Sequence, residues 1–437
     1  MKAGPDADPY VPGHGDPAYA VARYELELSY RVVGNRLTGR ATITARALTE
    51  LDRFALDLHG LQATRVLVDG RPPAKHRHTA SKLRIRLAAP IPAGASFTVV
   101  IGYHGNPGPM QGPMSGPDGN AGWEELEDGV IVASQPHGAP TWFPCNDRAG
   151  DKAAYHFTIS APSAYRVVAN GRLLSSKRGA SSTTWEYEQP EPMSPYLATL
   201  QLGQYAEYEL PALVPMSVVL PPDRAARLEP VFTRQPEMLA AFVEMFGDYP
   251  FSRYTAVVTD DELEIPLEAQ TLSIFGSNFL GDTWANERLV AHELAHQWFG
   301  NSLTAASWSD IWLHEGFACY AEWLWSERSG RDSADQHARH HWQRLSGLPQ
   351  DLVLTAPGAA DMFDDRVYKR GALTLHALRR ALGDMPFFSL LRSWTSTHAY
   401  GTVTTADFLS LAEVAAGRDL TPLLDPWLRE PALPPLP

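Results

Sequence analysis

The feature that most constrains this chain is a pair of histidines four residues apart, His292 and His296, in the segment AHELAHQWFG. Positions i and i+4 of an α-helix lie on one face, so a helix here places both imidazoles where one metal ion can bind them. Glu293 directly follows the first histidine and can reach a water on that metal without being a ligand itself. The segment therefore predicts a helix that carries part of a metal centre.

A third ligand is predicted downstream. Eighteen residues separate His296 from Glu315 in the segment WLHEGFA, and we expect Glu315 to lie on a second helix that packs against the first. Two histidines and one carboxylate leave zinc a fourth position for water, which is the open arrangement of catalytic sites. Chance is the alternative for the histidine pair alone, and Glu315 argues against it. A structural zinc site would favour paired cysteines, whereas Cys145 and Cys319 stand far apart.

Two neighbours of Glu315 have weaker assignments. Glu322 lies seven residues further on, close to the same helical face, and can orient a ligand histidine through the free ring N–H. A solvated helix glutamate is the alternative for Glu322. His314 lies about 100° around the helix from Glu315, so we expect it to be a poor third ligand.

The periodicity of the first half of the chain indicates β-structure. Short alternating segments are separated by Gly, Pro and Asp-Gly turns, and they predict strands at 24–30, 41–45, 82–87, 97–103, 129–133 and 154–159. A Gly/Pro-rich loop at 105–122 interrupts them. We therefore expect residues 1–209 to form an N-terminal all-β domain, either a sandwich or a saddle-like sheet.

From residue 210 onward, helical patterns join the strand patterns. Strands are predicted at 216–220 and 254–258, and helices at 230–246, 286–298, 310–325 and 367–382. Asn286 is the expected N-cap of the histidine helix, and Gly383 is the expected stop of the last helix. This order favours an α+β domain over residues 210–437 that ends in a helical lobe. We expect the closing segment PALPPLP to be a solvated tail.

Composition and charge exclude several classes of protein. The formal net charge of −13 argues against a nucleic-acid partner, which would need a basic face. The first twenty residues lack the apolar core of a secretory signal, and no stretch approaches the roughly 18 apolar residues that span a bilayer. Two isolated cysteines argue against a disulfide framework. We therefore expect buried thiols, no membrane partner and a cytoplasmic location.

With their spacing, AHELAHQWFGN and WLHEGFA resemble the M1 family of zinc aminopeptidases, the gluzincin group that includes aminopeptidase N. The resemblance covers nearly the whole chain. It implies an N-terminal β domain followed by a thermolysin-like catalytic domain. It also implies one Zn²⁺ per chain, bound by His292, His296 and Glu315, with Glu293 as the general base.

The resemblance implies three further site residues. Glu268 in IPLEAQTL matches the carboxylate that holds the free α-amine of the substrate, and Gln135 in SQPHGAPTWFPC matches a second residue of that amine site. Tyr368 in VYKRGAL matches the tyrosine that stabilises the oxyanion. The segment around Glu268 departs from the Gly-x-Met-Glu-Asn pattern of the family, because Leu267 and Ala269 flank the glutamate.

The function implied by the resemblance is a zinc metallo-aminopeptidase that hydrolyses the N-terminal peptide bond of peptides with a free N-terminus. Longer members of the family carry a helical C-terminal domain over the cleft, so we expect a more open cleft here. Two alternatives stay open, a zinc endopeptidase with an open cleft and a catalytically inactive scaffold of the same architecture. The intact set of candidate residues argues against the inactive scaffold. The oligomeric state and the preferred N-terminal residue stay open.

Overall fold

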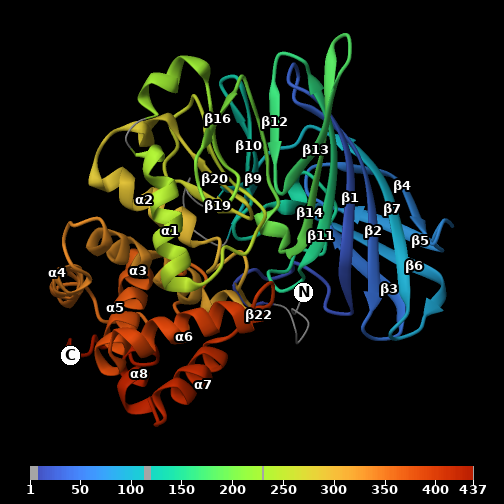
Figure 1. Ribbon diagram of the computed structural model, residues 1–437. Coiled ribbons are helices and arrows are strands. Elements are labelled where there is room, and N and C mark those ends of the chain that lie inside the picture. Colours follow the sequence, from blue (N-terminus) through green and yellow to red (C-terminus); the bar gives the residue numbers. More distant parts are fainter. Residues whose placement is uncertain (1–7, 113–119, 229–230, 437) are drawn as a thin grey trace.

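The computed structural model describes residues 8–112, 120–228 and 231–436 (Figure 1). A β-rich region formed by the first half of the chain lies beside a mixed region of helices and strands, which leads into a group of helices. This order confirms the expected β domain followed by an α+β domain with a helical lobe. Residues 113–119 of the predicted loop at 105–122 and the first residue of the predicted helix at 230–246 lie outside the described residues.

A seven-stranded sheet forms the centre of the β-rich region. Its strands follow the order β13 (Arg172–Arg178), β14 (Ser182–Met193), β11 (Ala153–Pro162), β1 (Tyr19–Arg31), β2 (Arg36–Ala47), β7 (Ser96–Gly105) and β4 (Gln62–Val68). β1 pairs in parallel with β11, and the other pairs are antiparallel. Within β1, Tyr24, Leu26 and Leu28 are buried while Glu25 and Glu27 are exposed. The alternation seen in the sequence therefore marks the two faces of this strand.

Two smaller sheets complete the β-rich region. One contains β3 (Leu51–Asp57), β6 (Lys82–Ile91) and β5 (Lys75–Thr79), and the other contains β12 (Arg166–Ala169), β15 (Leu200–Gly203), β10 (Gly129–Ala133), β9 (Asn120–Leu126) and β8 (Met110–Gln111). The ring of Phe54 on β3 packs against Tyr19 and Phe97 of the seven-stranded sheet, with ring centroids 5.5 and 5.4 Å apart. β10 ends two residues before Gln135, so this sheet leads directly to a predicted site residue.

The mixed region is built on a fourth sheet. Its order is β16 (Ala206–Leu210), β17 (Met216–Leu220), β18 (Tyr254–Val258), β20 (Leu272–Phe275) and β19 (Leu267–Ala269). The three inner strands are parallel and the two edge strands are antiparallel to them. β16 crosses the predicted domain boundary between residues 209 and 210 and pairs with β17. That boundary stays a prediction.

Eight helices are described. They are α1 (Gln235–Phe246), α2 (Trp284–Ala295), α3 (Trp312–Arg328), α4 (Ala334–Ser346), α5 (Asp365–Leu382), α6 (Asp384–Thr397), α7 (Thr405–Ala416) and α8 (Thr421–Leu428). A short parallel pair, β21 (Thr304–Ala305) and β22 (Thr402–Val403), joins the loop after α2 to the segment before α7. No helix within the described ranges is long and apolar enough to cross a membrane.

The predicted helices correspond to α1, α2, α3 and α5, and Gly383 ends α5 with a φ of +83°. The expected N-cap of α2 is wrong. The side chain of Thr283 caps this helix by accepting a hydrogen bond from the backbone N–H of Asn286, which lies in the first turn. Thr283 and Asn286 are both good capping residues, and the apolar spacing does not distinguish between them.

The end of the described chain is bound to α5 but is not buried, because residues 431, 432 and 435 are exposed, so the expectation of a solvated tail is confirmed only in part. The buried guanidinium of Arg370 donates hydrogen bonds to the carbonyl oxygens of Leu352, Pro426, Trp427, Glu430, Pro431 and Ala432. Trp342 of α4 also donates to the carbonyl oxygen of Pro434, at 2.7 Å. A buried cation needs such acceptors, and backbone acceptors cannot be read from side-chain identity.

α3 and α5 approach each other closely at two glycines. A Cβ atom added at Gly316 would lie 2.8 Å from the Cα of Gly371, and one added at Gly371 would lie 2.6 Å from the Cα of Gly316. The missing side chains therefore allow the two backbones to touch. The contact lies directly after Glu315 on α3 and three residues after Tyr368 on α5, so it sets the spacing between two predicted site residues.

We expect Gly371→Ala to lower the free energy of unfolding by about 1–3 kcal/mol, because the added methyl group forces the two helices apart. Denaturant unfolding followed by circular dichroism measures this change. Gly108→Ala is the control, because a Cβ at Gly108 meets nothing within 4 Å. An equal unfolding midpoint for the wild type and Gly371→Ala would contradict the close-contact account.

Candidate metal centre

The structure brings the three predicted metal ligands together. The Nε2 atoms of His292 and His296 each lie 3.4 Å from the same Oε2 atom of Glu315. The histidines come from α2 and the end of its last turn, and Glu315 comes from the first turn of α3. All three side chains are buried, and one ligand atom from each lies within 4.8 Å of the others.

Hydrogen bonds on the far side of each ring fix its tautomer. The Nδ1 of His292 lies 2.8 Å from Oε1 of Glu322, and the Nδ1 of His296 lies 2.9 Å from the carbonyl oxygen of Phe299. Both partners are acceptors, so each Nδ1 carries a proton and donates it. Each Nε2 therefore faces Glu315 and is the ring nitrogen available to a metal ion, as in histidines that bind metal.

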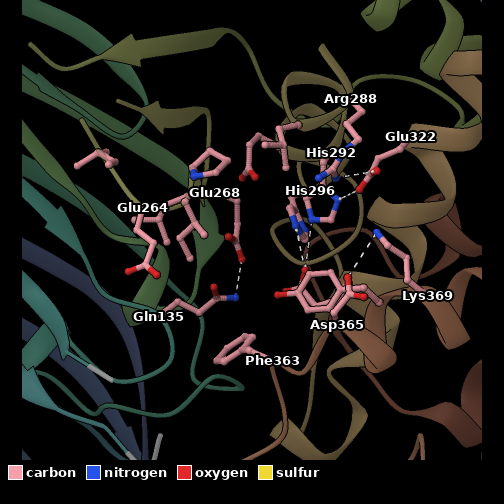
Figure 2. Close-up of a pocket in the computed structure, with 18 of the residues that line it drawn as sticks. Gln135, Glu264, Glu268, Arg288, His292, His296, Glu322, Phe363, Asp365 and Lys369 are labelled. Atoms are coloured by element: carbon pink, nitrogen blue, oxygen red, sulfur yellow. Dashed lines mark hydrogen bonds and ion pairs between the residues drawn. The ribbon is translucent and has the colours of Figure 1, made fainter. Parts of the chain in front are cut away.

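Glu322 is buried, and Arg288 donates to its second carboxylate oxygen at 3.1 Å. The alternative of a solvated helix glutamate is therefore wrong. Burial raises the pKa of the Glu322 carboxyl, but the positive charge of Lys369 and the hydrogen bond from His292 outweigh burial and lower it. Glu322 thus stays ionised and holds the ring of His292 in place (Figure 2).

The donor set fits a zinc ion. Zinc bonds to nitrogen and oxygen of about 2.0–2.1 Å in a tetrahedron separate neighbouring ligand atoms by roughly 3.3–3.4 Å. The two separations between Glu315 and the histidines are 3.4 Å. Two nitrogen lone pairs and a carboxylate facing one another also need a cation between them. Three protein ligands leave one further position of the metal for water or substrate.

The charges around the ligands favour a cation at this point. Burial lowers the pKa of His296, but the carboxylates of Glu268 and Glu315 outweigh burial and raise it to about 10. Burial raises the pKa of Glu315, yet His296 and His292 lower it below its usual range. The same electric field that favours protonated imidazoles would stabilise a bound divalent metal.

Glu293 has the properties of a proton acceptor. Its carboxylate is buried, and its Oε2 atom has no hydrogen-bond partner among the described residues. Burial raises the pKa of Glu293 to about 8, against the opposing effect of the two ligand histidines. A carboxylate whose pKa lies near neutrality can accept a proton and return it within one reaction cycle.

Glu268 and Gln135 meet beside the metal ligands, although Glu268 lies on β19 and Gln135 lies in the turn that follows β10. The Nε2 of Gln135 donates a hydrogen bond of 2.6 Å to Oε1 of Glu268. Figure 2 shows this pair on one side of the two histidines, with Arg288 and Glu322 on the other. Burial raises the pKa of Glu268 to about 6. The two residues implied for the amine site thus form one polar group at the metal centre.

Two residues that the sequence did not identify position Glu268. Gln297 accepts from the N–H of Thr271 at 2.9 Å and donates to the carbonyl oxygen of Ala269 at 3.0 Å. Asn301 donates to the same carbonyl oxygen, also at 3.0 Å. These bonds tie β19 to the end of α2. Both residues directly follow the histidine motif in AHQWFGN, and that proximity was the only available signal.

Tyr368 lies beside the centre and His314 does not. The ring of Tyr368 stacks near the ring of His292, with centroids 5.9 Å apart and an angle of 23° between the planes. Burial, with the carboxylates of Glu315 and Glu268, raises the pKa of Tyr368, so its hydroxyl keeps a proton to donate. The Nε2 of His314 accepts a hydrogen bond from the N–H of Ala305 at 2.7 Å, as expected for a residue that is not a ligand.

One cavity of about 1140 Å³ is lined by the predicted metal ligands and by the other candidate site residues, namely Gln135, Glu268, His292, Glu293, His296, Glu315, Glu322 and Tyr368. On one side it reaches residues of the β-rich region, including Glu124 and Ile131, and on the other it reaches α4, including His337 and His340. A space of this size accommodates a short peptide with its side chains. The same lining includes the three predicted metal ligands, so a peptide bound in the cavity can reach them.

We expect Glu322→Gln to weaken zinc affinity about 10- to 100-fold, because a neutral amide holds the ring of His292 less firmly. Competition with a chromogenic chelator measures the affinity directly. Glu262→Gln is the matched control, since Glu262 is an exposed acidic residue on the same cavity. Equal zinc affinity in the wild type and Glu322→Gln would show that Glu322 does not support the ligand.

Two family models match this chain. The Peptidase M1 N-terminal domain matches residues 21–197, and the Peptidase family M1 domain matches residues 232–427. Aminopeptidase N of Streptomyces lividans is 28% identical over 316 residues, which cover 63% of this chain and 35% of that protein. Aminopeptidase M1 of Arabidopsis thaliana is 23% identical over 453 residues, which cover 96% of this chain and 51% of that protein. The chain thus spans about a third to a half of these curated relatives.

Solved structures match over the whole chain. The crystal structure of an M1 zinc metallopeptidase from Deinococcus radiodurans is 30% identical with a TM-score of 0.89, and the match covers 98% of each chain. A mutant of the Deinococcus radiodurans enzyme bound to a Tyr-Ser-Ala substrate is similar at a TM-score of 0.90, also with 30% identity and 98% of each chain. The similarity therefore includes both sheet regions and the helical lobe.

Proposed function

We propose that this chain, which belongs to peptidase family M1, is a zinc aminopeptidase that hydrolyses the N-terminal peptide bond of peptides. Its substrates are peptides with a free N-terminus. The Tyr-Ser-Ala peptide in the similar metallopeptidase supports a peptide substrate for this chain. The two cysteines are buried and unpaired, which supports a reducing, cytoplasmic location as part of the proposal.

Zinc is the cofactor of this site, and when bound it supplies a Lewis acid that polarises a carbonyl group and lowers the pKa of a water molecule. His292, His296 and Glu315 hold the ion. Glu293 accepts a proton from the attacking water at its free Oε2 and delivers it to the leaving amine. Tyr368 donates its phenol hydrogen to the oxygen on which negative charge develops.

The observation that carries the aminopeptidase assignment is the contact between Gln135 and Glu268. The buried carboxylate of Glu268 lies within 4.8 Å of ligand atoms of Glu293 and His296. An ammonium group that pairs with Glu268 places the first carbonyl of a peptide next to the metal ligands. A fixed charge beside the reacting bond selects which bond is cut.

The two alternative functions, an endopeptidase and an inactive scaffold, do not explain the burial of Glu268 and Glu293. An endopeptidase would need no anionic anchor beside the metal, yet Glu268 is buried there at the cost of desolvation. An inactive scaffold would not need the buried, unpartnered oxygen of Glu293. Both features support an active exopeptidase.

We expect Glu293→Gln to lower kcat by at least about 10²–10⁴-fold, because an amide cannot accept the proton. Zinc content, measured by atomic absorption, should stay at one ion per chain, since Glu293 is not a ligand. The conservative change keeps the shape of the side chain. Turnover near the wild-type level in Glu293→Gln would contradict the role of general base.

We expect Glu268→Ala to lower kcat/KM on peptides with a free N-terminus by about 30-fold or more, because losing one partner of a buried charge pair costs about 2–5 kcal/mol. Each peptide is assayed in free and N-acetylated form by chromatography. The wild type should cleave only the free form. Ready cleavage of acetylated peptides by the wild type would favour the endopeptidase, and an unchanged rate in Glu268→Ala would remove Glu268 as the anchor.

A further inference from the structure

Besides Glu322, three buried carboxylates surround the metal centre, and of these only Glu315 contacts both ligand histidines. The other two, Glu268 and Glu293, form a second group with His296, in which one ligand atom from each residue lies within 4.8 Å of the others. Ionised carboxylates at this separation repel each other unless a cation or a proton lies between them. The arrangement of the second group therefore favours a bound cation or a proton between the two carboxylates.

The second group also has an oxygen directed at no partner. Oε2 of Glu293 is buried without a hydrogen bond from the described residues, in a side chain that is 3% exposed. Glu268 is held in position, because Gln135 donates to its Oε1 and the backbone next to it is bound by Gln297 and Asn301. The fixed carboxylate of Glu268 thus lies within 4.8 Å of a second carboxylate, that of Glu293, which has one unpartnered oxygen.

His296 cannot serve two metals. Its Nδ1 donates to the carbonyl oxygen of Phe299, so only its Nε2 is free, and that atom belongs to the zinc set with Glu315. A second ion beside the zinc would therefore rely on the two carboxylates and water. Oxygen-only ligands of this kind suit Mn²⁺ and similar hard divalent cations, which keep several waters. Paired metal ions lie about 3.5–4 Å apart in proteins, which agrees with a shared cluster of this size.

We propose that Glu268 and Glu293 bind a second divalent cation of the Mn²⁺ class beside the zinc. The ion occupies the position that the proposed function gives to the ammonium group of the substrate, and it engages the free oxygen of Glu293. It therefore inhibits the enzyme by competing with the peptide. The inhibition rests on the proposed function, whereas the binding of the ion does not.

Electron paramagnetic resonance of Mn²⁺ tests the site directly, because free Mn²⁺ has a signal that is lost on binding. Zinc-loaded wild type is titrated with Mn²⁺, and zinc is assayed before and after each titration. We expect one Mn²⁺ per chain with zinc retained. Glu268→Ala and Glu293→Gln should both lose this binding, and Glu262→Gln, which removes an exposed charge from the same cavity, should keep it.

The outcomes separate the site from the function. Absence of Mn²⁺ binding to the zinc-loaded wild type, or equal binding by Glu268→Ala, overturns the second site. Binding that depends on Glu268 supports the site even if no peptide is cleaved. When peptides are cleaved, Mn²⁺ should raise the apparent KM and leave kcat unchanged. Bound Mn²⁺ without any change in KM overturns the inhibition.

Discussion

The sharing of one Glu315 oxygen by two histidine nitrogens is the interaction on which the rest of the structure depends. This contact requires that the Nε2 atoms of both rings face Glu315. The rings are held in this orientation because Nδ1 of His292 donates to Glu322 and Nδ1 of His296 donates to the carbonyl oxygen of Phe299. The contact also needs α2 and α3 to lie close together. The buried charges would destabilise the protein without a cation, so metal binding and folding of this region are coupled.

The position of the anchor relative to the metal comes from contacts between the two halves of the chain. Gln135 reaches Glu268 from the β-rich region. Next to β11, Lys152 donates to the carbonyl oxygens of Asn301 and Ser302 at 2.9 and 2.8 Å, and burial lowers its pKa to about 7. The same loop after α2 carries Asn301, which binds β19. The β-rich region therefore helps to form the site.

The spacing of the histidine motif and Glu315 was sufficient to predict that His292, His296 and Glu315 lie together, because helix geometry relates the spacing of residues in the sequence to the direction of their side chains. Strand alternation likewise predicted the β-rich region. Glu268, Gln135 and Tyr368 were identified only by resemblance, because they come from separate elements that only the tertiary fold brings together. The strand attachment through Gln297 could not be predicted for the same reason.

Backbone partners explain the remaining misses. Arg370 binds the end of the described chain by donating hydrogen bonds to backbone carbonyl oxygens. Every residue has a carbonyl oxygen, so no sequence pattern identifies which ones will accept. The cap of α2 at Thr283 depended on a choice between two suitable residues. The helices α4, α6, α7 and α8 were not predicted individually, although the helical lobe to which they belong was.

We propose that the metal and the substrate amine occupy neighbouring but separate positions in the site, the metal at His292, His296 and Glu315 and the amine at Glu268. A crystal structure of the zinc-loaded protein with an uncleaved ligand that carries a free N-terminus tests it most directly. The account predicts anomalous scattering from zinc between His292, His296 and Glu315, with the amine nitrogen in hydrogen-bond contact with Glu268. Zinc held elsewhere, or an amine that lies away from Glu268, would contradict it.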